Sequence, residues 1–267
     1  MQFTDKVGAE RVCLSPTAME MREARGIAID SLDYEVSPIY LDSVQTLGAS
    51  VLHTSRWMNG ATVQASEEAI EVIEACEFVE SVEKTRGNVG EVVNVGEAVN
   101  VGEAVNVGEA VNVGEAVNVD EAGEQLDQLN LLPLHQAGYK GRGIRIGIAD
   151  GGFYRANSML SLPQDQCLGY ADLTDDEEDM FSSIGDHGTM CLSTIMATQD
   201  NYTGAATEAE YYLFRTEEEY TESPKEIDNW VAAIEMADSM GLHIVSTSLG
   251  YTTFDDAEMD LQYADMD

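Results

Sequence analysis

The sequence predicts two folded units of mixed α and β structure joined by a repetitive segment, and the second unit is an α/β domain built on a parallel sheet. Three observations lead to this prediction. Residues 90–119 consist of near-identical hexapeptides that separate two stretches of ordinary sequence complexity. The stretch before them has the element order of a split βαβ unit. The stretch after them alternates short apolar runs with amphipathic segments, as in a parallel sheet flanked by helices.

The first unit is expected over residues 1–86. Its predicted elements are a helix from Ser37-Pro38 to Leu47, strands over residues 49–54 and 59–64, a helix capped by Ser66 and a strand over residues 78–84. Alternating apolar residues indicate the strands, and the acidic residues after Ser66 suit the first turn of a helix. His53 is expected to be a packing or surface residue. We therefore expect a small α+β unit without a catalytic constellation.

The segment between the units, residues 87–123, contains four consecutive copies of GEAVNV over residues 96–119. Hexapeptide repeats can build a parallel β-helix, but about three hexapeptides form one coil and several coils must stack to bury a core. Each copy carries one Glu and no cation, so charge repulsion favours an extended chain. We interpret the segment as an extended linker, with local β structure as the alternative.

The second unit is expected over residues 124–267. Its predicted elements are strands at residues 144–149, 211–215 and 243–247, and helices at residues 188–198 and from the capping-box sequence at 223–226 to Gly241. One apolar face of the second helix is expected to consist of Ile227, Trp230, Val231 and Ile234. Strands that alternate with helices in this way are parallel and are joined by right-handed crossovers.

Composition excludes several functional classes. The 267 residues carry 50 acidic and 13 basic side chains, a formal net charge of −37. Such a charge repels phosphate backbones and anionic lipid, so neither nucleic acid nor a membrane is an expected partner. The sequence contains no membrane-spanning apolar stretch and no signal peptide. Four scattered cysteines without a CxxC pair argue against a zinc finger, and we expect buried free thiols, with a Cys167–Cys191 bridge as the alternative.

Two polar side chains lie at the carboxyl ends of strands, where parallel sheets bind their ligands and carry their catalytic residues. Asp150 directly follows the strand expected at residues 144–149, and His187 stands at the start of the next helix. Each residue alone suits a turn or a helix cap. Together they would face one crevice, where the carboxylate fixes the imidazole tautomer and the other ring nitrogen acts as a base toward a hydroxyl. Gly188 would let the backbone approach closely.

Four sequence blocks resemble the subtilisin-like serine peptidases. They read LHQAGYKGRGIRIGIADGGF at residues 134–153, DHGTMCLS at 186–193, GAATEAE at 204–210 and VSTSLG at 245–250. The resemblance implies a subtilisin-like parallel sheet, with Asp150 as the orienting acid and His187 as the general base and acid. It also implies that Ser248, Leu249 and Gly250 pair with the substrate backbone, as an added strand does.

Residues 1–86 resemble the prodomain of these peptidases. The resemblance implies polypeptide substrates, the protein's own prodomain as a partner in cis, and a secreted or periplasmic location. It implies no required cofactor. We interpret the acidic run at residues 175–179 as a solvated loop, with calcium binding as the alternative.

The sequence departs from the family pattern at the nucleophile. It contains no Gly-Thr-Ser and no G-x-S-x-G, and Ser193 lies on the expected helix, too close to His187 to be the nucleophile. We therefore interpret the chain as the front portion of a subtilisin-like serine endopeptidase and expect the 267-residue chain alone to be inactive. A non-catalytic peptidase-binding or inhibitory protein, or a decayed peptidase fragment, is the alternative. A hexapeptide-repeat acyltransferase or adhesin would need many more coils.

Overall fold

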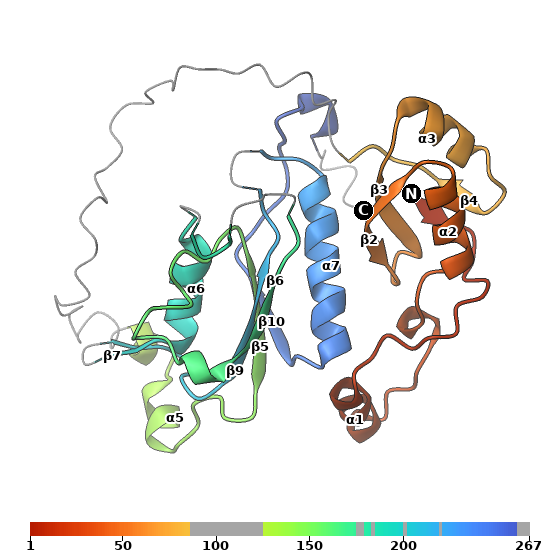
Figure 1. Cartoon of the computed structure of the whole chain (residues 1–267). Coiled ribbons are helices and arrows are strands. Elements are labelled where there is room, and N and C mark those ends of the chain that lie inside the picture. Colours follow the sequence, from red (N-terminus) through yellow and green to blue (C-terminus); the bar gives the residue numbers. More distant parts are fainter. Residues whose placement is uncertain (86–124, 175–178, 183–184, 200–201, 219–220, 261–267) are drawn as a thin grey trace, which may run out of the picture.

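The computed structural model of the chain describes residues 1–85, 125–174, 179–182, 185–199, 202–218 and 221–260 (Figure 1). The predicted repeat linker, residues 87–123, and residues 175–178 of the acidic run lie outside this part of the chain. The described residues form a first unit and a second unit, each with a four-stranded sheet. None of their helices is both long and apolar enough to cross a membrane.

The first unit contains an antiparallel sheet in the order β2-β3-β1-β4. Its elements are β1 (Gln2–Phe3), α1 (Pro16–Arg25), α2 (Pro38–Thr46), β2 (Ser50–Ser55), β3 (Gly60–Gln64), α3 (Glu67–Glu74) and β4 (Val79–Ser81). The hydroxyl oxygens of Ser37 and Ser66 accept backbone N–H groups in the first turns of α2 and α3, as N-caps do. The predicted helices and strands are confirmed, although β4 is shorter than predicted. The sequence analysis did not anticipate β1 and α1.

The second unit contains a parallel sheet in the order β10-β5-β9-β6. Its strands are β5 (Arg145–Asp150), β6 (Cys167–Asp172), β9 (Glu210–Arg215) and β10 (Ile244–Thr247), and its helices are α5 (Leu132–Gln136), α6 (His187–Met196) and α7 (Lys225–Met240). Two short strands, β7 (Thr198–Gln199) and β8 (Tyr202–Thr203), pair antiparallel. The predicted α/β fold is confirmed. Strand β6 was not predicted, because it is an edge strand that alternates half-buried and exposed residues and so lacks the apolar run of a central strand.

The two faces of the parallel sheet are covered by different helices. One face packs against α6 through Ile148, Leu213, Leu192 and Met196. The other face packs against α7 through Ala149, Phe214, Ala233 and Ala237. Because side chains alternate along a strand, Asp150 and Arg215 project toward the same side as Ile148 and Leu213. The parallel strands β5, β9 and β10 have their carboxyl ends side by side. We call this end of the sheet, where the strands finish, the carboxyl edge.

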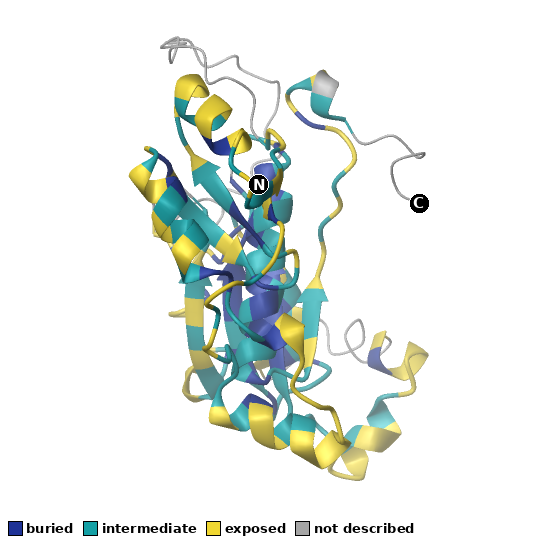
Figure 2. Cartoon of the chain, turned by 90° about the vertical axis from the view of Figure 1, so that its right-hand side faces the viewer, coloured by how far each residue is buried: buried dark blue, intermediate teal, exposed yellow. Residues whose placement is uncertain are grey.

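Helix α7 lies between the two sheets, which corrects the prediction of one apolar face (Figure 1). In the view with the first unit in front, buried residues gather in the middle of the molecule (Figure 2). Ala233 and Ala237 face the parallel sheet, whereas Ile227 and Val231 line a cavity of about 300 Å³ against the first unit. A helix covered on two sides needs apolar groups on both, so a single stripe does not describe it.

The predicted capping box at the start of α7 forms only in part, whereas the predicted end of the helix at Gly241 is confirmed. Only half of the predicted capping box forms, because Glu226 accepts the Ser223 N–H at 3.4 Å while the Ser223 hydroxyl has no partner among the described residues. Gly241 ends α7 in the left-handed conformation, at φ 75°, as predicted.

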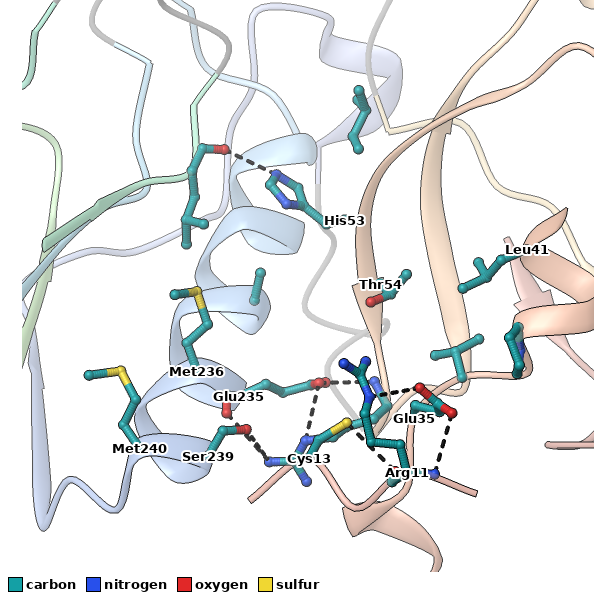
Figure 3. A pocket seen from close by; sticks show the side chains of 16 residues that line it. Arg11, Cys13, Glu35, Leu41, His53, Thr54, Glu235, Met236, Ser239 and Met240 are labelled. Carbon is teal, nitrogen blue, oxygen red and sulfur yellow. Dashed lines mark hydrogen bonds and ion pairs between the residues drawn. The ribbon is translucent and has the colours of Figure 1, made fainter. Parts of the chain in front are cut away.

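The first unit docks on α7 through charged and polar groups. Arg22 and Arg56 both bind the carboxylate of Asp238, at 2.9 and 2.6 Å. The backbone N–H of Arg56 donates to Glu235 at 2.9 Å. A cavity of about 560 Å³ remains between β2 and α7, with His53 on one wall and Met236 and Met240 on the other (Figure 3). The contact therefore depends on specific polar groups more than on continuous apolar packing.

His53 and the cysteines have structural surroundings. His53 Nε2 lies 3.1 Å from the carbonyl oxygen of Leu173, so this histidine packs at the contact between the two units, as a packing or surface residue does. All four cysteines are free thiols, so the alternative Cys167–Cys191 bridge is not formed. They are half-buried rather than fully buried, which corrects the sequence expectation.

Candidate active site

Asp150 and His187 meet at the carboxyl edge of the sheet. Asp150 ends β5, is 1% exposed, and accepts the Gly151 N–H at 2.8 Å through Oδ1. His187 begins α6, and its Nδ1 lies 2.8 Å from Oδ1 and 3.0 Å from Oδ2 of Asp150. Because a carboxylate only accepts hydrogen bonds, a neutral imidazole here carries its proton on Nδ1 and keeps the lone pair on Nε2. The His187 side chain is 55% exposed, so the ring is accessible.

Glycines allow the end of β5 to approach α6 this closely. A Cβ atom on Gly188 would lie 2.5 Å from the Gly152 carbonyl oxygen and 2.9 Å from Asp150 Cβ. A Cβ atom on Gly152 would lie 2.6 Å from the Gly185 carbonyl oxygen. No side chain fits at these distances, so the expected close approach at Gly188 is confirmed, and the spacing between Asp150 and His187 depends on glycine.

Cys191 lies one helical turn after His187 and contacts it. Its Sγ is 3.9 Å from both Nδ1 and Nε2 of the imidazole. The thiol donates to Ser248 Oγ at 3.5 Å. Burial raises the pKa of the Cys191 thiol, so it packs against the imidazole as a neutral group rather than as a nucleophilic thiolate.

The predicted substrate-pairing segment, Ser248 to Gly250, follows β10 directly. Cys191 links Ser248 to His187, and the next residue, Tyr251, donates its phenolic O–H to the carboxylate of Glu217. Burial raises the pKa of both Tyr251 and Glu217. This hydrogen bond joins the segment after β10 to the loop after β9.

Two groups of described side chains bring potential metal-ligand atoms within 4.8 Å of one another. They are Asp150, His187 and Cys191, and Glu217, Glu222 and Glu226. In the first group Nδ1 of His187 is already engaged by the carboxylate of Asp150, and the Cys191 thiol donates to Ser248. In the second group, the carboxylates of Glu217 and Glu226 already accept protein hydrogen bonds. In both groups, therefore, some of the potential ligand atoms already have protein partners.

Comparison with protein families agrees with this geometry. The profile described as Subtilase family matches residues 141–265, which include Asp150, His187 and Ser248 to Gly250. Residues 141–265 are a subtilase domain. Residues 1–97 match the profile described as Peptidase S8 propeptide domain, Bacteroidota. A search of curated proteins found no match. The resemblance drawn from the four sequence blocks is thereby confirmed, and the family is one of serine peptidases.

The subtilase domain also contains site residues that sequence analysis missed. Cys191 follows His187 by four positions, a spacing that places both on one helical face. Arg215 ends β9 in register with Asp150 and could have been found by aligning the strand ends. Ser193 lies on α6 and donates to the Thr189 carbonyl at 2.7 Å, as expected of a helical serine.

Glu226 makes the stability of the subtilase domain depend on pH. It is 1% exposed in the first turn of α7, and burial, together with the nearby carboxylates of Glu217 and Glu222, raises its pKa to about 8. The folded protein therefore holds a proton that the unfolded chain, with the ordinary value of 4.5, releases. The stability that this group contributes should fall as pH rises from about 4.5 to about 8.

Melting temperatures measured from pH 5 to 9 check this expectation. Glu226→Gln should flatten the decline, whereas Glu71→Gln on the exposed side of α3 should leave it unchanged. If melting temperature falls with pH equally steeply in the native chain and in Glu226→Gln, Glu226 is not the source of the pH dependence.

Proposed function

We propose that the chain carries the acid and the base of a subtilisin-type serine endopeptidase. The supporting observation is the 2.8 Å contact between a buried Asp150 carboxylate and the exposed imidazole of His187, within the subtilase match. In the proposed reaction Nε2 of His187 removes the proton from a nucleophilic serine as it attacks the peptide carbonyl. The same nitrogen then returns that proton to the leaving amine.

The remaining site residues have supporting roles in this proposal. Asp150 holds the Nδ1 proton, fixes the tautomer and stabilises the imidazolium as it forms. Ser248, Leu249 and Gly250 pair with the substrate backbone at the free edge of β10. This reaction requires proton transfer and positioning and no cofactor, and we assign no catalytic role to calcium at residues 175–179.

We further propose that residues 1–86 act as a prodomain in cis, joined by the linker 87–123 to the peptidase part at 124–267. The propeptide match and the docking of the first unit on α7 support this arrangement. The proposed substrates are polypeptides, and the proposed site of action is outside the cytoplasm, as in the family. The net charge of −37 disfavours nucleic acid and membrane surfaces as partners.

The peptidase activities of two forms of the chain, without and with a Gly-Thr-Ser segment, test the proposal. The 267 residues contain no Gly-Thr-Ser, so the purified chain should not hydrolyse an unstructured, fluorescently labelled protein. An extended version of the chain, to which a Gly-Thr-Ser segment has been added, should hydrolyse it and should be blocked by a serine-reactive inhibitor. Inhibitor-sensitive turnover by the 267-residue chain would contradict the first expectation. Inactivity of the longer version would overturn the peptidase assignment and favour the inhibitory alternative, which predicts that the chain binds a subtilisin-type peptidase.

A further inference from the structure

Arg215 is a fully buried cation at the carboxyl edge of the sheet. It ends β9, its residue exposure is 0%, and it lies in register with Asp150 on β5 and with Asp172 on β6. Burial of a charged side chain costs free energy unless its contacts in the protein compensate for the water that it loses. The position next to Asp150, on the same face of the sheet, suggests that these contacts serve the acid–base pair.

The guanidinium joins the loop after β5 to the end of β6. Its Nε donates to the Gly151 carbonyl at 3.2 Å, and Nη1 binds Asp172 Oδ2 at 3.3 Å. The next residue, Thr216, donates its backbone N–H to the Asp150 carbonyl at 3.1 Å. The end of β9 therefore holds the backbone carbonyls of both Asp150 and Gly151.

The loop after β5, which the end of β9 holds through the Gly151 carbonyl, also sets the distance between Asp150 and His187. Gly152 packs its backbone against Gly185 and Gly188, with no room for a side chain at either contact. A small displacement of Gly151 would be transmitted through this close packing to the start of α6. It would change the two Nδ1–Oδ distances of 2.8 and 3.0 Å.

We propose that Arg215 is a positioning residue for the Asp150–His187 pair. It acts through the Gly151 carbonyl rather than by contact with substrate, and this role rests on the proposed function of the pair. The planar guanidinium can donate toward Gly151 and Asp172 at once, whereas a lysine ammonium is a single flexible point charge. A purely structural role, neutralisation of Asp172, would affect stability without affecting the imidazole.

Proton NMR of the 267-residue chain tests the proposal without peptidase activity. The imidazole proton shared by His187 Nδ1 and Asp150 gives a low-field resonance, which His187→Ala assigns. In Arg215→Met this resonance should broaden beyond detection or shift, while circular dichroism retains the native helix content. Arg145→Met is the matched control, because Arg145 lies at the opposite end of β5 and pairs with Glu210.

A folded Arg215→Met with the native resonance would overturn the proposal. If Arg215→Met does not fold, Arg215→Lys and Asp172→Asn provide the test, since the first replaces the planar guanidinium by an ammonium and the second removes the carboxylate that it binds. Both should shift the resonance, and an unchanged resonance in both would equally overturn the proposal.

A kinetic readout separates this role from the proposed function. In the serine-bearing version, Arg215→Lys should lower kcat about 100-fold with KM unchanged, because small misplacements of catalytic groups have effects of that size. An inactive serine-bearing parent would refute the peptidase assignment but not the geometric role of Arg215.

Discussion

His187→Ala should lower kcat by about 10⁶-fold in a version that carries its nucleophilic serine, the size of effect found on removing the histidine of subtilisin. The variant lacks the imidazole that is proposed to take the serine proton as the bond to the peptide carbon forms. KM should change little, because the residues that pair with the substrate backbone remain. Steady-state hydrolysis of a peptide substrate measures both parameters.

Asp150→Asn should lower kcat by about 10⁴-fold for a different reason. An asparagine retains the size of the side chain and can still accept the Gly151 N–H, but its amide then donates toward His187. The imidazole must accept at Nδ1, and its proton moves to Nε2, where it removes the base.

His135→Ala is the control for both variants. His135 lies on α5 in the same unit, and its Nε2 contacts the Ala205 carbonyl at 2.9 Å, remote from Asp150. It should retain parental activity. Parental activity in either His187→Ala or Asp150→Asn would exclude the assigned acid–base pair.

The positions of Asp150 and His187 were predictable because they follow from local patterns. A short apolar run followed by Asp150 marks the end of a buried strand, and His187 precedes a segment with helical spacing. In a parallel sheet such positions share one edge, so the sequence order alone brings them together. The helices with serine caps were predictable for the same local reason.

The surroundings of α7 were not predictable from local patterns. Asp228, Glu235 and Asp238 look like a solvated helix face, since charged residues at helical spacing usually face water. In the structure Arg22, 216 positions away, and Arg56, 182 positions away, bind Asp238. Partners at such separations leave no trace in sequence periodicity, and the same holds for the burial of Arg215.

Arg56→Met should release the first unit from α7 once the linker is cut. The Arg56 side chain is 5% exposed, and its guanidinium lies 2.6 Å from Asp238 and 3.5 Å from Asp33. Methionine retains much of the apolar stem but leaves both carboxylates with fewer cationic partners. Loss of one member of a buried, hydrogen-bonded charge pair costs about 2–5 kcal/mol, and the 30% exposure of Asp238 favours the lower part of that range.

A protease site introduced into residues 87–123 of the full chain allows the docking of the first unit on α7 to be measured directly. After cleavage the two parts of the native chain should co-elute in gel filtration, whereas those of Arg56→Met should separate at the same concentration. Before cleavage the tether keeps the effective concentration high, so the intact variant should remain docked and folded. Arg11→Met is the matched control, because Arg11 is 73% exposed and its ion pair with Glu35 lies within the first unit.

Asp238→Asn tests the same contact from the α7 side. It should weaken docking in the same direction as Arg56→Met, and the double variant should lose less than the sum of the two single losses, because both changes remove one shared interaction. Rising salt should weaken the native contact more than the double variant, since only the native pair keeps its full charge attraction. Strict additivity, or co-elution of the cleaved Arg56→Met parts at the native affinity, would show that apolar contacts around the interfacial cavity hold the prodomain unit instead.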